Sequence, residues 1–140
     1  MLISSAFSLL LLPLTTQALA CFETQHQILK GALVAKDPVL VDSQEASYCV
    51  FAPQGHDVSL EEAAVALFPL GAANEGLEVY DRLFNSTHSP DYTVRAACIF
   101  ERYDLSGVSY LFRCLCRTDG CNKAGNLNAF LRRQTDDSLL

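Results

Sequence analysis

Hydrophobic and polar residues divide the chain into an apolar leader, two strand-like parts and a middle part with helical spacing. Residues 1–20 contain no charged side chain and include the run Leu9-Leu10-Leu11-Leu12. They end in Ala18-Leu19-Ala20, a small-residue pattern of the kind that signal peptidase cleaves. The sequence therefore predicts a signal peptide over residues 1–20 and a secreted, extracellular product.

The leader has two alternative interpretations. A membrane anchor would need about 20 consecutive apolar residues, and the run from Leu9 to Leu14 is shorter. A bacterial lipoprotein signal would make Cys21 the first mature residue, although Ala18 stands where such signals carry Leu. The C-terminal residues 132–140 are too polar for a GPI signal, so we expect no stable membrane insertion.

The pattern after the leader predicts three short strands. Apolar runs over Ile28–Ala35 and Val39–Val41 flank Lys36-Asp37-Pro38, whose composition is typical of a turn between strands. Residues Ala46–Ala52 form a third β-rich run, which Pro53-Gln54-Gly55 closes.

The middle of the chain has helical spacing. Ser59 and Glu62 form a capping-box pattern, and the apolar residues that follow at helical spacing are Ala63, Ala64, Leu67 and Phe68. Pro69 and Gly71 would end this helix. A second helix is predicted over Asn74–Phe84, with one apolar face made of Leu77, Tyr80, Leu83 and Phe84. Together they predict a helical insertion over about residues 59–84.

A β-hairpin is predicted nearer the C-terminus. Residues 92–100 and 108–114 are strand-like and flank Asp104-Leu105-Ser106-Gly107. In a hairpin symmetrical about Ser106, paired positions sum to 212, so Cys98 lies directly opposite Cys114. Opposed Cβ atoms are about 4.5–5.5 Å apart, slightly wider than a bridge needs and closest at a non-hydrogen-bonded pair. This direct opposition favours a disulfide between the two cysteines.

The six cysteines indicate a disulfide framework, because an even number in a secreted chain is typical of one. Three bridges allow fifteen connectivities. With Cys98 and Cys114 paired, Cys116 and Cys121 can close a small loop over Thr118-Asp119-Gly120, a good turn sequence. Cys21 and Cys49 would remain as the third pair.

The C-terminal cysteine cluster resembles the end of three-finger domains, the superfamily of snake toxins and urokinase-receptor-like proteins. That superfamily ends in two close cysteines, a short loop often containing Asp, and a final Cys-Asn. The corresponding residues in this chain are Cys114, Cys116, Asp119, Cys121 and Asn122. Among these proteins, the chain is most similar to small secreted cysteine-rich members of nematode type, near the ET module.

This resemblance implies a three-finger-like core with Cys98–Cys114 and Cys116–Cys121 bridges. It also implies that the Asn122 side chain hydrogen-bonds backbone at the disulfide-rich base. The chain departs from the family in that Leu115 separates cysteines that are usually adjacent, and two core cysteines are missing. We therefore expect a small disulfide-rich fold over residues 21–125, mainly β with a helical insertion, followed by a polar tail over 126–140.

Charge and motifs exclude several functions. The net charge is −6, and residues 21–94 carry eleven acidic against three basic residues, which argues against nucleic acid as a partner. His26, His56 and His88 lie in different regions and in no catalytic motif. The Cys-x-Cys spacing does not suit a zinc site, which normally has four ligands. We expect no catalytic residue, no metal and no cofactor.

The sequence thus predicts a secreted, non-enzymatic module that recognises an extracellular protein or receptor through its loops. Candidate binding residues are those at the hairpin tip, because aromatic, apolar and charged groups are typical of binding sites: Tyr103, Asp104, Leu105 and Tyr110. A small secreted hydrolase or hydrolase inhibitor, with its pocket between the predicted helices over Ser59–Phe84, is the alternative.

The sequence also contains one predicted modification site and one less favoured processing site. Asn85-Ser86-Thr87 is an N-glycosylation sequence. Cleavage at Arg132-Arg133 would release a seven-residue tail, although this pair also fits the exposed end of a helix that contains Leu127, Phe130 and Leu131.

Overall fold

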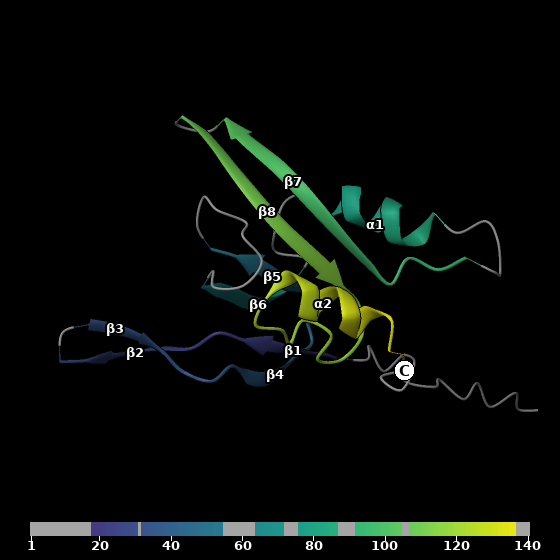
Figure 1. Ribbon diagram of the computed structural model, residues 1–140. Helices are drawn as coiled ribbons and strands as arrows, with labels where there is room; N and C mark the ends of the chain where they lie inside the picture. Colours follow the sequence, from purple (N-terminus) through teal and green to yellow (C-terminus); the bar gives the residue numbers. More distant parts are fainter. Residues whose placement is uncertain are drawn as a thin grey trace, which may run out of the picture.

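The computed structural model describes residues 18–30, 32–54, 64–71, 76–86, 92–104 and 107–136. These residues form a small, mainly β structure with three sheets, two helices and three disulfides. Figure 1 shows two long hairpins that leave the region around helix α2 and end well apart from each other.

The first hairpin is a two-stranded arm built in two parts. Near its base, β1 (Leu19–Glu23) pairs antiparallel with β4 (Val39–Ser43), and at its tip β2 (His26–Leu29) pairs with β3 (Ala32–Ala35). The chain reverses after Leu29, where Lys30 adopts a positive φ of 51°. Two-residue hairpin loops require this left-handed conformation.

The predicted turn at Lys36-Asp37-Pro38 is not a reversal between paired strands. These residues join β3 to β4 within the same limb of the hairpin, and the Lys36 N–H donates to the Gln25 carbonyl across the hairpin at 2.9 Å. Proline cannot donate to a β-ladder. A segment with Pro38 therefore interrupts the pairing without turning the chain back.

The main sheet has four strands in the order β6-β5-β8-β7. β5 (Ala46–Pro53) pairs with β6 (Val65–Gly71) and with β8 (Val108–Cys116), and β8 pairs with β7 (Ala96–Asp104). The β7–β8 register runs from Ala96 opposite Cys116 to Asp104 opposite Val108. The predicted hairpin symmetry is therefore confirmed, and β7 extends to Asp104 after starting four residues later than expected.

The predicted helix over residues 59–68 is wrong in its second half, because Val65–Gly71 is strand β6. Ser59 and Glu62 lie outside the described residues. The second predicted helix is present as α1 (Glu78–Asn85) and is shorter than expected. Gly76 has a φ of 88° and Leu77 still lies in a turn, so the helix begins at Glu78. Leu77, Tyr80 and Phe84 are buried, whereas Leu83 is 40% exposed.

The two faces of the main sheet have separate cores because side chains alternate along each strand. On the α1 face, Tyr48, Val50 and Leu115 pack against Tyr80 and Phe84 of α1. On the opposite face, which we call the disulfide face, five cysteines pack with Phe51, Leu67 and Phe130.

The disulfide face also holds the C-terminal helix. Residues Leu127–Gln134 form α2, and Asn126 caps it by accepting a hydrogen bond from the Ala129 N–H at 2.8 Å. Phe130 of α2 is fully buried and stacks on Phe51, with ring centroids 5.1 Å apart. Much of the segment predicted as a polar tail is thus a helix that contributes to the core, and Arg132 and Arg133 lie in its last turn.

The three disulfides join Cys21 to Cys49, Cys98 to Cys114, and Cys116 to Cys121. These are the pairs expected from the sequence. The first bridge joins β1 to β5, the second crosses the β7–β8 hairpin, and the third joins β8 to the loop before α2. Each bridge therefore links a different part of the chain to the centre of the main sheet.

Candidate functional site

The residues predicted at the hairpin tip lie on opposite faces of the β7–β8 hairpin. Asp104 and Tyr110 belong to the disulfide side of the hairpin, together with Cys98 and Cys114, because paired and alternate positions share a face. Tyr103 belongs to the α1 side and donates a hydrogen bond to Glu101 Oε2 at 3.1 Å. Leu105 lies outside the described residues. The four residues therefore do not form one cluster.

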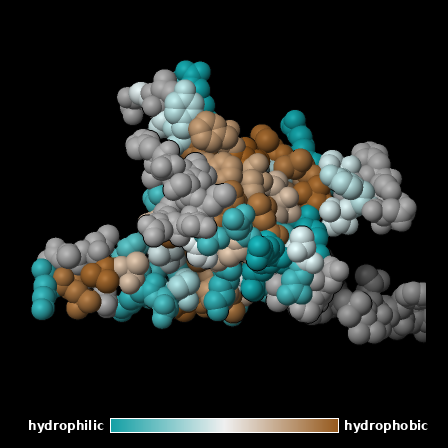
Figure 2. All heavy atoms as spheres, in the orientation of Figure 1, coloured by the Kyte–Doolittle hydropathy of each residue, from teal (hydrophilic) through white to brown (hydrophobic). Residues whose placement is uncertain are grey.

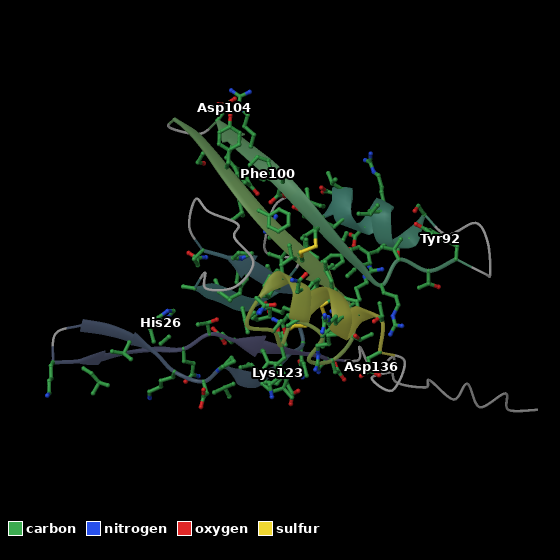
Figure 3. The ribbon with its side chains drawn as sticks, viewed as in Figure 1. His26, Tyr92, Phe100, Asp104, Lys123 and Asp136 are labelled. Atoms are coloured by element: carbon green, nitrogen blue, oxygen red, sulfur yellow. A yellow bond between two sulfur atoms is a disulfide. The ribbon has the colours of Figure 1, made fainter. Side chains whose placement is uncertain are left out.

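An exposed aromatic pair lies on the disulfide side of this hairpin, beyond the part that α2 covers. Phe100 and Tyr110 are 66% and 61% exposed, and their rings stack with centroids 5.6 Å apart. Phe100 and Asp104 are labelled along the hairpin in Figure 3. Sequence reasoning missed Phe100. The available signal was its spacing of two residues from Cys98, which places both side chains on one face.

A polar cluster connects the other side of the hairpin to α1. Glu101 accepts a hydrogen bond from Tyr80, and its Oε2 lies 2.8 Å from Arg113 Nε in a nearly buried ion pair. Arg113 also donates to the Tyr80 hydroxyl at 2.6 Å and lies over the Tyr80 ring. Burial, and then the neighbouring Glu101, raise the pKa of Tyr103. These hydrogen bonds and the ion pair connect the hairpin to Tyr80 and so to α1.

A second arginine connects the same helix to the base of the sheet. Arg117 lies over the rings of Tyr48 and Phe84, and its guanidinium donates to Asn85 Oδ1 at 2.8 Å. The Tyr48 hydroxyl donates to Asp81 at 2.5 Å. Burial together with the Asp81 carboxylate raises the pKa of Tyr48 above its ordinary value. Because each of these groups is occupied by a neighbour, the contacts indicate a structural role.

Asn122 connects the two ends of the domain. Its side chain is fully buried, and Oδ1 accepts from the Phe22 N–H at 2.9 Å. Nδ2 donates to the carbonyls of Phe22 and Val50, each at 2.9 Å. These are hydrogen bonds to backbone at the base, as the resemblance implies.

The loop before Asn122 holds the start of β1. Asp119 Oδ1 accepts from the Ala20 N–H at 2.9 Å, and the Gly120 N–H donates to the Ala20 carbonyl at 2.7 Å. Gly120 has a φ of 63°, and a Cβ there would lie 3.1 Å from the Phe22 ring. This position needs glycine for its backbone conformation and for the close approach.

The predicted glycosylation site lies at the end of α1. Asn85 is exposed, and its Oδ1 accepts a hydrogen bond from Arg117. This hydrogen bond uses the amide oxygen and not the amide nitrogen, to which a glycan would be attached. Thr87, the third residue of the sequence motif, lies outside the described residues.

The hydrolase alternative predicts a histidine beside a carboxylate. His26 is exposed on β2, while His56 and His88 lie outside the described residues. Within the parts of the chain that the structure describes, no group of three or more histidine, cysteine, aspartate or glutamate residues is placed to hold a metal ion. All six cysteines are in disulfides.

Surface hydropathy differs between regions. Figure 2 shows hydrophobic residues along the β7–β8 hairpin and next to α1, and hydrophilic residues over the α2 region. Neither of the helices within the described residues is long and apolar enough to cross a membrane.

Comparison with known proteins places the chain in one family. No curated protein and no solved structure gives a significant match. The sequence model of DUF5354, described as a family of unknown function, matches residues 14–135. Since this match covers most of the 140 residues, the chain belongs to the DUF5354 family.

Proposed function

We propose that this protein is a secreted, non-enzymatic binding module with a three-finger-like core, and that it recognises an extracellular protein through the β7–β8 hairpin. The observation that carries this proposal is the exposed, stacked Phe100–Tyr110 pair on a projecting hairpin. Aromatic side chains are enriched among the residues that dominate protein interfaces. Contiguous exposed apolar surface is typical of interaction sites.

The topology supports the three-finger part of the proposal. Three hairpins, β1–β4 with its β2–β3 tip, β5–β6 and β7–β8, start from a base that contains two disulfides and the buried Asn122. The Cys98–Cys114 bridge lies within the third hairpin. A rigid base of this kind lowers the entropy that a projecting hairpin loses on binding.

The binding site is tested with a panel of purified extracellular domains, presented to the secreted protein and to two variants. Phe100→Ser/Tyr110→Ser removes the aromatic pair. Val79→Ser is the matched control, because Val79 is 65% exposed on α1, away from the hairpin. We expect at least one domain to bind the wild type and the control, and to bind the double variant at least about tenfold more weakly. Equal binding of all three proteins, or no binding domain, would contradict the proposal.

Secretion is a separate part of the proposal, and the contacts of β1 support one cleavage position. Leu19 and Ala20 belong to β1, and Ala20 makes two hydrogen bonds with the Asp119-Gly120 loop. Cleavage after Ala18 keeps both residues and also satisfies the small-residue rule, with Thr16 and Ala18 before the cut. We therefore expect the secreted chain to begin at Leu19, two residues before the Cys21 start that the sequence pattern predicts. N-terminal sequencing measures this directly, and a chain that begins at Cys21 would reject it.

A further inference from the structure

An open cleft lies at the β6 edge of the molecule, at the opposite edge of the main sheet from the aromatic pair. Its volume is about 640 Å³, within the range of roughly 300–1,000 Å³ that is usual for small-molecule sites. The cleft lies between the first hairpin, β6 and the segment that leads into α2. Its apolar lining includes Pro38, Val65, Leu67, Ala124 and Ala129.

Thr24 is the uncharged polar residue among the described lining residues, and its hydroxyl is held inside the wall. Thr24 Oγ1 accepts from the Leu67 N–H at 2.7 Å and donates to the Val65 carbonyl at 3.3 Å. The hydroxyl proton is thus used within the wall and is not offered to a ligand. The floor of the cleft therefore behaves as an apolar surface.

The charged residues among the described residues that line the cleft all have one sign. Lys36, Lys123 and Arg133 line it, and none of the described residues that line it carries a carboxylate. Arg133 is oriented by a hydrogen bond from Nε to the Gly120 carbonyl at 3.1 Å, and Lys123 Nζ lies 4.9 Å from the Phe22 ring centroid. Lys123 is labelled beside the base of the first hairpin in Figure 3.

This concentration of positive charge is unusual for the chain, whose net charge is −6. Lys36 is one of three basic residues between residues 21 and 94. A cleft with an apolar floor and three cations complements a ligand with an apolar body and an anionic head. We propose that it binds a long-chain carboxylate of the fatty-acid class, with the chain against Val65 and Leu67 and the carboxylate among Lys36, Lys123 and Arg133.

Binding is measured with the fluorescent fatty acid cis-parinaric acid, titrated into the full secreted protein and displaced with palmitate. We expect saturable binding with one site per chain. The methyl ester of the same acid should bind at least about tenfold more weakly, because it lacks the charge that the three cations attract. A shorter acid should lose affinity by up to about fourfold for each methylene that no longer contacts the floor.

Two pairs of variants locate the ligand. Ala129→Phe fills the cleft and should reduce binding at least tenfold, whereas Asn128→Phe, one residue earlier on α2 and outside the lining, should leave binding unchanged. Lys36→Gln/Lys123→Gln should weaken binding about fivefold or more. Lys30→Gln, at the tip of the first hairpin, is its control. Circular dichroism and disulfide mapping confirm that each variant is folded.

Three results would overturn the proposal: equal binding of acid and ester, equal binding by Ala129→Phe and Asn128→Phe, or no displacement by palmitate. A protein that binds anionic phospholipid vesicles but not the free acid would also overturn it, in favour of a membrane surface. Because the cleft and the aromatic pair are at opposite edges of the sheet, Phe100→Ser/Tyr110→Ser should not change fatty-acid binding. Each proposal can therefore fail without the other.

Discussion

The two faces of the main sheet are held together by different kinds of interaction. The disulfide face contains five cysteines, the Phe51–Phe130 stack and α2. The α1 face contains no cysteine among its described core residues, and its helix is fixed by Arg113 and Arg117 acting on tyrosines and carboxylates. One face therefore depends on oxidation and the other on charge and hydrogen bonding, so the two should respond to different perturbations.

The largest expected effect is the loss of a disulfide from the disulfide face. The chain-entropy model predicts that Cys21→Ala/Cys49→Ala, which opens a link across 28 residues, lowers the free energy of unfolding by about 3–4 kcal/mol. Cys116→Ala/Cys121→Ala opens a link across five residues and should cost about 2 kcal/mol. Urea unfolding of both variants gives the order, and the reverse order would show that packing, not loop closure, dominates.

The next effect concerns Asn122, the polar residue buried in the disulfide face. Asn122→Ala leaves the Phe22 N–H and the carbonyls of Phe22 and Val50 without their partner. We expect a loss of about 2–3 kcal/mol, because unsatisfied buried polar groups cost about 1–3 kcal/mol each and water can reach some of them. Asn128→Ala, at an exposed position, is the control. A loss below about 0.5 kcal/mol would show that Asn122 contributes little to stability.

On the α1 face, the Arg113–Glu101 pair should show strong coupling. Arg113→Leu leaves Glu101 nearly buried without its cation and should cost about 1–3 kcal/mol. Arg113→Leu/Glu101→Leu should recover part of this loss, since it removes both charges. Arg102→Leu breaks an exposed pair with Asp104 and should change stability by less than about 1 kcal/mol. If the losses of stability in Arg113→Leu and Glu101→Leu simply add in the double variant, the two residues are not coupled.

The smallest expected effect on stability at neutral pH is that of the Tyr48 ionisation, and this effect grows in alkaline solution. Because the pKa of Tyr48 is raised in the folded state, its contribution to stability is fully present below the pKa of an unfolded tyrosine, about 10. Above that pH the unfolded state loses a proton that the folded state keeps, and stability falls by up to about 1.4 kcal/mol per pH unit. Tyr48→Phe should flatten this decline between pH 10 and 11. If stability falls equally in Tyr48→Phe over this pH range, the fall is caused by other groups.

The third hairpin could be predicted from sequence because two independent patterns agreed. Strand-like residues 92–100 and 108–114 predicted the two strands, which the structure has at 96–104 and 108–116. Symmetry about Ser106 predicted a register that places Cys98 opposite Cys114, and the structure has that register. The hydrogen bonds of Asn122 could be expected only from the resemblance, since their partners Phe22 and Val50 are distant in the sequence.

Strand β6 could not be predicted, for a reason that its packing makes clear. Ala63, Ala64, Leu67 and Phe68 recur at the spacing of a helix face, and this spacing predicted a helix. In the structure Leu67 packs on the disulfide face and its neighbour Phe68 on the α1 face, as consecutive residues of a strand do. Pairing with β5 makes this segment a strand and not a helix, and the local sequence does not reveal that pairing. Pro69 is tolerated because β6 lies at the sheet edge.

The contacts of Asn122 also set an order of events during biosynthesis. Phe22 lies 100 residues before Asn122, so its strand leaves the ribosome long before its hydrogen-bonding partner exists. The Cys21–Cys49 bridge can form early in that interval, because its cysteines are 28 residues apart. The base of the domain is completed only when the last segment arrives. Nascent chains that stop before Asn122 should therefore carry an oxidised but unfinished N-terminal half, and are natural substrates for chaperones.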